Sequence, residues 1–315
     1  RQSCLTVLSA GIAAPEKAVE VSDEKRDGRA GEIHALSVCF PEIFLFRARR
    51  AGVAAPAIFQ RAGARVIKTD CAWQARLETA FGPEARFTWE PVPIETGAHP
   101  AAAQIITVRR RKQAEAGQVV FTHGLGGSVL SPVSIAACRG FWSAGCALHL
   151  IETPFSLNLC GNSLHAWRYA HQRRCYETAL TRILERLDGA GPVMLSGTSF
   201  GGHYAILRGL AAHDPHPVLA LCPVISGQVS LEARRRADPD FLRRMARDGF
   251  IVAESEIDEQ TGHLVREAWE DWTRAVQLAP ALDEAAPEAL RGVQVIAGES
   301  DPKVPLCALR PFFEA

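Results

Sequence analysis

The sequence predicts an α/β fold, in which a mostly parallel sheet is covered by helices on both faces. Short apolar strands alternate with helices from residue 119 to 224, an order that is typical of parallel strands joined by crossover helices. Two of these strands, VVFT at 119–122 and VLALCPV at 218–224, are apolar along almost their whole length. Such strands are buried on both sides, which requires helices on both faces of the sheet.

The first 80 residues are expected to form an N-terminal extension that is partly helical or disordered. Residues 1–40 show no sustained hydrophobic period, so we expect loop or poorly ordered chain there. Apolar spacing predicts a helix over 41–68, interrupted near Gly52 and Pro56, and a shorter helix over 71–80.

The core of the α/β fold is expected over 81–226 and 292–315. Residues 86–93 and 103–109 are predicted strands, the second because it is rich in β-branched residues. The other expected strands are 119–122, 147–152, 193–197, 218–224 and 293–297, and the expected helices are 132–144, 164–187 and 200–212. Between the two parts of the core, residues 227–291 break the alternation, and helical spacing over 231–248 and 264–279 predicts a helical insertion that acts as a lid.

Composition excludes several classes of protein. Lys plus Arg and Asp plus Glu both number 35, so the formal net charge is zero and a general nucleic-acid binder is not expected. The nine cysteines include no C-x-x-C and no His/Cys pair at zinc spacing, which predicts no metal site and favours a reducing, cytoplasmic location. An alternative is a remnant signal peptide over 5–14. No transmembrane segment is expected, because the uncharged stretch 117–138 contains four glycines and Pro132.

The pattern G-x-S-x-G occurs at Gly197-Thr198-Ser199-Phe200-Gly201, between a predicted strand and a predicted helix. A serine on such a sharp turn presents its hydroxyl at the end of the sheet, and the flanking glycines let strand and helix approach closely. The helix that begins here directs its positive dipole end at the same place. The pattern predicts a nucleophilic Ser199; the alternative is a glycine-lined turn with an idle serine.

Two further segments lie at the ends of predicted strands. His123-Gly124-Leu125-Gly126-Gly127 follows strand 119–122, and the N–H groups of Leu125 and Phe200 together would form an oxyanion hole; His123 is expected to brace this loop and not to act as the base. Beyond strand 293–297, Asp301 is preferred over Glu299 as the acid that orients a catalytic histidine. An Asp-Pro turn is otherwise an ordinary loop feature.

In this order, HGLGG, GTSFGG and GESDPKVP resemble the oxyanion loop, nucleophile elbow and acid turn of the α/β-hydrolase superfamily, over about residues 86–315. Within it, LIETPFSLNLCG followed by a long helix and GTSFGGHYA is similar to the abhydrolase domain 18 type. The resemblance implies the α/β-hydrolase fold, with Ser199 as nucleophile, Asp301 as triad acid, and Leu125 and Phe200 as oxyanion donors.

The sequence departs from the superfamily at the third triad member. The catalytic histidine should follow the acid after one more strand, yet none of the ten histidines follows Asp301. We expect a chain truncated before that histidine, with strand 293–297 left as an exposed sheet edge; a degenerate hydrolase and a substitute histidine are the alternatives. Without a base to take the serine proton, the chain as given is expected to be a poor or inactive hydrolase. His203 should point away from the Ser199 hydroxyl, one helical turn further on, and His263 lies in the insertion.

A serine nucleophile points to acyl transfer on a carboxylic ester, thioester or amide through an acyl-enzyme intermediate, with a small-molecule acyl substrate and no cofactor. The alternative is a non-catalytic binding or scaffold protein on the same fold. The aromatic residues of the insertion either line an apolar acyl pocket or only pack the insertion onto the core; they are Phe241, Phe250, Trp269 and Trp272. The oligomeric state and the acyl group are not predicted.

Overall fold

The computed structural model describes residues 5–9, 71–94, 101–112, 114–154, 156, 168–188, 191–211, 216–254, 261–298, 301, 304 and 309. The helix expected over 41–68 lies outside these residues, as does most of the segment 1–40 that was expected to be loop.

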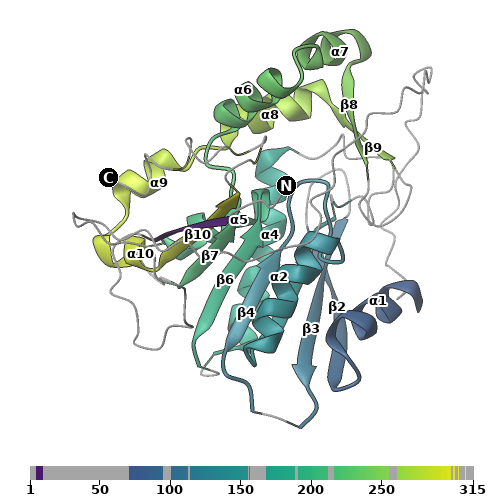
Figure 1. Cartoon of the computed structure of the whole chain (residues 1–315), viewed down its shortest axis with the longest axis vertical. Helices are drawn as coiled ribbons and strands as arrows, with labels where there is room; N and C mark the ends of the chain where they lie inside the picture. The colour runs from purple at the N-terminus through teal and green to yellow at the C-terminus, as the bar shows by residue number, and fades with distance from the viewer. Residues whose placement is uncertain are drawn as a thin grey trace, which may run out of the picture.

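Among the described residues, eight strands form one sheet in the order β1-β10-β7-β6-β4-β5-β3-β2 (Figure 1). The five strands β10, β7, β6, β4 and β5 run parallel, whereas β3 runs against β5 and β2 against β3. The strands are β1 (Leu5–Ser9), β2 (Ala85–Ile94), β3 (Ala101–Arg110), β4 (Gln118–Thr122), β5 (Ala147–Glu152), β6 (Val193–Thr198), β7 (Val218–Leu221) and β10 (Val293–Gly298).

Helices cover both faces of this sheet. The helices α1 (Cys71–Phe81) and α2 (Pro132–Ser143) contribute to one cluster of buried side chains, and α4 (Tyr169–Arg186) and α5 (Phe200–Gly209) contribute to another. Neighbouring residues of β4 divide between the two clusters, with Val120 in the second and Val119 and Phe121 in the first, because successive side chains of a strand point to opposite faces. The expected fold class, a mostly parallel sheet with helices on both faces, is confirmed.

The insertion between β7 and β10 contains a hairpin as well as helices. Its elements are α6 (Gly227–Ala237), α7 (Phe241–Asp248), β8 (Phe250–Glu254), β9 (Thr261–Val265), α8 (Arg266–Ala275), α9 (Ala279–Glu284) and α10 (Pro287–Arg291). The expected helix over 231–248 is divided, because Pro239 disfavours helical backbone at Asp238, which adopts φ −142° and ψ 87°. The expected helix over 264–279 begins only at Arg266, since the preceding residues pair as β9 with β8. Figure 1 shows α6, α7 and α8 gathered beyond one end of the sheet.

The expectation that strand 293–297 forms an exposed sheet edge is wrong. Strand β1 pairs antiparallel with β10, from Leu5 opposite Gly298 to Ser9 opposite Gln294. Backbone groups at a sheet edge pair readily with another extended segment, and the apolar, β-branched sequence LTVLS suits a strand. Residues 5–9, expected to be loop or part of a signal peptide, therefore form the edge of the sheet. Among the described helices, none combines the length and the apolar character that crossing a lipid bilayer requires.

Candidate active site

The predicted site residues gather at the carboxyl ends of the parallel strands. Ser199 follows β6, His123 follows β4, and Asp301 lies three residues beyond β10. Cys222, which was not among the predicted site residues, follows β7 at the same edge. Neighbouring parallel strands end at the same edge of a sheet, and ligands of open α/β sheets bind outside that edge. The topology therefore brings together segments that are up to 178 residues apart in the sequence, from His123 to Asp301.

Ser199 adopts a backbone conformation that is rare for residues other than glycine. It lies between β6 and α5 with φ 52° and ψ −110°. Its N–H donates to the carbonyl of Leu221 at 2.8 Å, and its carbonyl accepts from the N–H groups of His203 and Val224, both at 3.1 Å. Such strain persists only where the surroundings fix it, and here three backbone hydrogen bonds do so. The serine thus stands, half-buried, at the N-terminal end of α5.

The two glycines of the G-x-S-x-G pattern lie where no side chain fits. A Cβ on Gly197 would be 2.5 Å from the carbonyl carbon of Gly201, and one on Gly201 would be 2.7 Å from the carbonyl oxygen of His123 and closer still to that of Thr122. These contacts are with backbone atoms, which cannot rotate away. Glycine therefore lets α5 pack against both β6 and the end of β4.

The loop after β4 lies directly beside Ser199. A Cβ on Gly124 would be 3.1 Å from Ser199 Cβ and 3.6 Å from Ser199 Oγ. The carbonyl of Gly124 accepts from the Gly127 N–H at 3.0 Å, and Gly126 has φ 71°, as the third residue of a type II turn requires. Leu125, half-buried, occupies the second position of this turn, and Phe200 is fully buried at the first residue of α5. The convergence of their N–H groups on one point stays a prediction.

His123 is buried and uses both ring nitrogens. Its Nε2 accepts from the Thr153 N–H at 3.1 Å and lies 2.9 Å from the Thr153 hydroxyl, while its Nδ1 lies 2.7 Å from the Gly124 carbonyl oxygen. These contacts tie His123 to its own loop and to the end of β5. They are the contacts that a bracing residue would make.

Asp301 is held in the turn that follows β10. Its Oδ1 accepts from the Val304 N–H at 3.1 Å, and its own N–H donates to the carbonyl of Gly298 at 3.2 Å. Its carboxylate also accepts a hydrogen bond from the Cys222 thiol. Burial, and then the charge of Asp301, raise the pKa of Cys222 to about 12, so this thiol stays protonated at neutral pH.

None of the hydrogen bonds made by the described side chains joins a histidine to Ser199 Oγ. His203 Nε2 lies 3.0 Å from the Tyr169 hydroxyl, and its Nδ1 donates to the carbonyl of Val224 at 2.9 Å. Burial lowers the pKa of His203 to about 4. His149 is bound to Gln118 at 2.9 Å and to Thr107 at 3.2 Å. Both rings have structural partners.

Aromatic side chains of the insertion pack against the residue that follows the serine. The ring centroids of Trp272 and Phe200 are 5.6 Å apart, those of Trp269 and Trp272 are 4.8 Å apart, and those of Phe241 and Trp269 are 5.7 Å apart. All four side chains are buried. These contacts pack Phe241, Trp269 and Trp272 within the insertion and against Phe200 of the core, and Phe250 is half-buried at the start of β8.

Sequence reasoning missed Glu152, the last residue of β5. Its side chain is fully buried, and its Oε2 accepts from the Val129 N–H at 2.7 Å and from the Ser128 hydroxyl at 3.0 Å. Its Oε1 is buried without a hydrogen-bond partner. A signal was available in the sequence: Glu152 is an ionisable residue at the end of a largely apolar strand, whose six residues are all buried in the structure. Because carboxylates are rarely buried without a specific partner, this position could have been singled out.

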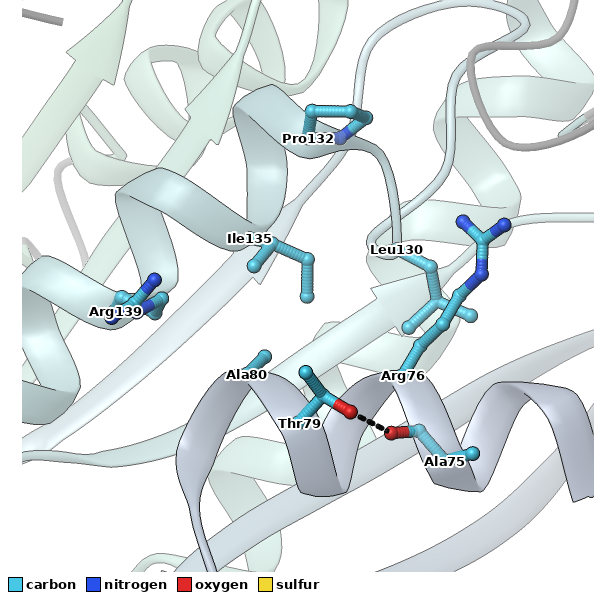
Figure 2. Close-up of a pocket in the computed structure, with 8 residues that line it drawn as sticks. All are labelled: Ala75, Arg76, Thr79, Ala80, Leu130, Pro132, Ile135 and Arg139. Carbon is cyan, nitrogen blue, oxygen red and sulfur yellow. Dashed lines mark hydrogen bonds between the residues drawn. The ribbon is translucent and has the colours of Figure 1, made fainter. Parts of the chain in front are cut away.

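A hollow in the surface lies between α1 and the start of α2 and is not lined by the site residues described above. Figure 2 shows it between α1 and the start of α2, with Arg76 and Arg139 on opposite sides of the smaller side chains. Its lining consists of Ala75, Arg76, Thr79, Ala80, Leu130, Pro132, Ile135 and Arg139. None of the predicted site residues is among them.

No protein-family model matches the sequence, and no curated protein matches it. Among solved structures, esterase Est22 is 18% identical over 50% of this chain and 52% of its own, with a TM-score of 0.39. Brefeldin A esterase, a bacterial homologue of human hormone-sensitive lipase, is 18% identical over 67% of this chain and 60% of its own (TM-score 0.39). A putative hydrolase from Agrobacterium vitis S4 is 13% identical over 62% and 74% (TM-score 0.45).

The chain spans about half the length of the first of these relatives, 52% of Est22 and 53% of a bacterial heroin esterase. At these identities the likeness concerns the fold alone and assigns no substrate to this chain.

Proposed function

We propose that the chain is a serine hydrolase that cleaves a carboxylic ester, thioester or amide through an acyl-enzyme intermediate. The observation that carries the proposal is the strained backbone of Ser199 at the start of α5, with Gly124 packed against its side chain. A structural turn needs neither the positive φ at a serine nor a glycine loop from a neighbouring strand beside the hydroxyl. Both features suit a nucleophile next to an oxyanion hole.

In this mechanism Ser199 Oγ attacks the substrate carbonyl carbon while its proton passes to a base. The resulting oxyanion accepts hydrogen bonds from the Leu125 and Phe200 N–H groups. When it collapses, the bond from the carbonyl carbon to the leaving group breaks, the base returns its proton to the leaving group, and the acyl-enzyme remains. Water then repeats the attack and releases the acid. Asp301 is proposed to orient the base. None of the described residues is assigned the role of that base.

The insertion is proposed to cover the site as a lid. Support comes from the contact between Trp272 and Phe200, because Phe200 carries one of the proposed oxyanion donors. An apolar acyl group entering beside Phe200 would meet the ring of Trp272. We therefore propose that the lid favours substrates with apolar acyl chains.

The second candidate function is a non-catalytic binding or scaffold protein. It is favoured by a specific observation: both ring nitrogens of His123 and of His203 have hydrogen-bond partners other than Ser199. The Asp301 carboxylate likewise binds Val304 and Cys222. On this hypothesis the strained serine is a remnant of an active ancestor.

Two finer assignments belong to the same proposal. We place the activity in the cytoplasm because Cys138, Cys146, Cys175 and Cys222 are all free thiols, as a reducing compartment would keep them. We also retain the abhydrolase domain 18 type as the proposed subgroup, on the sequences LIETPFSLNLCG and GTSFGGHYA.

A fluorophosphonate probe tests the proposal, because it phosphonylates activated serines. The purified chain and its Ser199→Ala and Ser143→Ala variants are treated with the probe and measured by intact mass. Ser143 is the matched control, being an exposed serine at the end of α2. We expect one adduct on the wild type and on Ser143→Ala, and none on Ser199→Ala. An unlabelled wild type, or equal labelling of all three proteins, would instead support the non-catalytic candidate.

A further inference from the structure

We propose that Glu152 and Thr153, at the carboxyl end of β5, are positioning residues that fix which way the Gly124–Leu125 peptide faces at Ser199. The inference rests on the proposed function, since it assigns a purpose to contacts around the proposed oxyanion loop. The supporting observation is a set of hydrogen bonds from the end of β5 to the loop. Thr153 binds His123 at the start of the loop, and Glu152 binds Ser128 and Val129 at its end.

The first step concerns the proton on His123. The Thr153 backbone N–H can only donate, and it donates to His123 Nε2 at 3.1 Å. A neutral imidazole has one donor and one acceptor nitrogen, so Nε2 is the acceptor and Nδ1 carries the proton. The Nδ1–H then donates to the Gly124 carbonyl at 2.7 Å. The backbone N–H of Thr153 thus selects the tautomer that binds Gly124. The Thr153 hydroxyl, 2.9 Å from Nε2, holds the ring in place through a second contact, which is the contact that a valine at this position would remove.

The second step concerns the peptide between Gly124 and Leu125. The Gly124 carbonyl is held by two donors, His123 Nδ1–H at 2.7 Å and the Gly127 N–H at 3.0 Å. In a trans peptide the C=O and the N–H point in opposite directions. Fixing the Gly124 carbonyl toward His123 therefore directs the Leu125 N–H away from it. Gly124 itself packs against Ser199, so this peptide is the part of the loop that the serine faces.

The third step concerns the far end of the loop. Glu152 Oε2 accepts from the Val129 N–H at 2.7 Å and from the Ser128 hydroxyl at 3.0 Å, and it lies 3.9 Å from His123 Nε2. The carboxylate is fully buried, and one of its oxygens has no partner. Burying a carboxylate in this way is costly, so a purely structural loop anchor would be better served by a neutral side chain. The loop is therefore held at its start by Thr153 and at its end by Glu152.

These contacts should matter most when negative charge develops on the substrate. An oxyanion donor acts mainly in the transition state, so misdirecting it lowers the rate of bond formation and leaves ground-state binding almost unchanged. Removal of a whole donor lowers rates about 10²–10³-fold. For misdirection of a donor that is still present, we expect losses of about 10–100-fold.

The experiment compares Glu152→Ala, Glu152→Gln, Thr153→Val and Thr153→Ser with the wild type, using the fluorophosphonate probe. The maximal rate of phosphonylation and the half-saturating probe concentration are measured separately. Thr107→Val is the matched control, because it removes another threonine–histidine contact, 3.2 Å from His149 Nδ1, in the middle of β3. Thermal unfolding shows which variants fold, and Thr153→Val carries the test if Glu152→Ala does not fold.

We expect the maximal rate to fall about 100-fold in Glu152→Ala and about 10-fold in Thr153→Val at unchanged half-saturation. Glu152→Gln should recover most of the loss, because an amide oxygen still accepts from Val129, and Thr153→Ser should recover all of it. The control should match the wild type. Wild-type rates in Thr153→Val and in any folded Glu152→Ala, or an equal loss in the control, overturn the inference.

A second readout does not need an active serine. In protein labelled with [15N]leucine, the Leu125 amide signal should shift in Thr153→Val and in any folded Glu152→Ala, and it should stay in place in Thr107→Val. If the wild type is not phosphonylated, the proposed function fails, and the Leu125 signal alone decides whether these residues position the peptide. A Leu125 signal that stays in place in Thr153→Val and in any folded Glu152→Ala overturns the inference whatever the outcome with the probe.

Discussion

Substituting Gly201 by alanine tests whether the close packing of α5 on β4 builds the site. The added Cβ would lie 2.7 Å from the His123 carbonyl oxygen and from Thr122 Cγ2, and nearer still to the Thr122 carbonyl oxygen. Two of these three atoms belong to the backbone at the end of β4. The clashes with these backbone atoms can be relieved only if α5 moves away from β4 and from the loop that begins at His123.

Two opposing effects determine how much Gly201→Ala changes the free energy of unfolding. Overpacking a tightly packed site costs about 1–3 kcal/mol, whereas replacing a glycine inside a helix by alanine gains roughly 0.5–1 kcal/mol. We expect Gly201→Ala to lower the free energy of unfolding by about 2 kcal/mol, because the clash is with backbone. Gly140→Ala is the matched control: this glycine lies within α2, and a Cβ there would meet nothing within 4 Å. It should raise the free energy of unfolding by about 0.5–1 kcal/mol.

Urea unfolding monitored by circular dichroism gives both values, provided that the slope of free energy against urea is the same in the two variants. Phosphonylation of Ser199 should also slow in Gly201→Ala and not in Gly140→Ala, since only the first displaces α5. If Gly201→Ala proves as stable as Gly140→Ala, the packing argument is refuted.

Two further predictions concern other parts of the core. Burial lowers the pKa of His203 to about 4 from about 6.5 in an unfolded chain, so between these pH values only the unfolded state binds a proton at this residue. The free energy of unfolding should therefore fall by about 2 kcal/mol from pH 7 to pH 5 because of His203. Urea unfolding of His203→Gln should show a correspondingly weaker pH dependence. Trp272→Ala should cost about 3–5 kcal/mol by opening a cavity beside Phe200 and Trp269; a loss below about 1 kcal/mol by the same measurement would mean that the insertion is not packed as described.

The parts of the fold that were predicted correctly depend on local sequence. Strand, glycine turn and helix follow one another within residues 193–209, and Gly197 and Gly201 mark the close approach. Short, almost continuous apolar runs predicted the central strands, such as 119–122 and 218–224. Pro239 was an equally local signal for the division of the expected helix over 231–248, and it was overlooked.

The parts that were missed depend on pairing between distant segments. Nothing within residues 5–9 specifies that they pair with β10, more than 280 residues further on. Similarly, the residues of β9 continue a helical pattern into α8, and only their pairing with β8 makes them a strand. In both cases the decisive hydrogen bonds come from a partner that single-sequence periodicity cannot identify.

Strain at the carboxyl edge of the sheet separates the two candidate functions. Among the described residues, the non-glycine residues with positive φ are Ser199 and Cys222, at 52° and 45°. They follow the neighbouring strands β6 and β7, and the Ser199 N–H binds the carbonyl of Leu221, the residue before Cys222. Each such position costs on the order of 1–3 kcal/mol.

A scaffold would gain nothing from two adjacent strained residues, and substitutions by glycine would relieve both. A nucleophile gains from the strain, because the turn that strains Ser199 also places it beside Gly124 and at the start of α5. Cys222 completes the arrangement, since its thiol binds Asp301 while its N–H binds the Ile296 carbonyl at 2.6 Å. The strain is thus concentrated where the proposed nucleophile and the proposed acid are attached to the sheet, which favours catalysis over a passive scaffold.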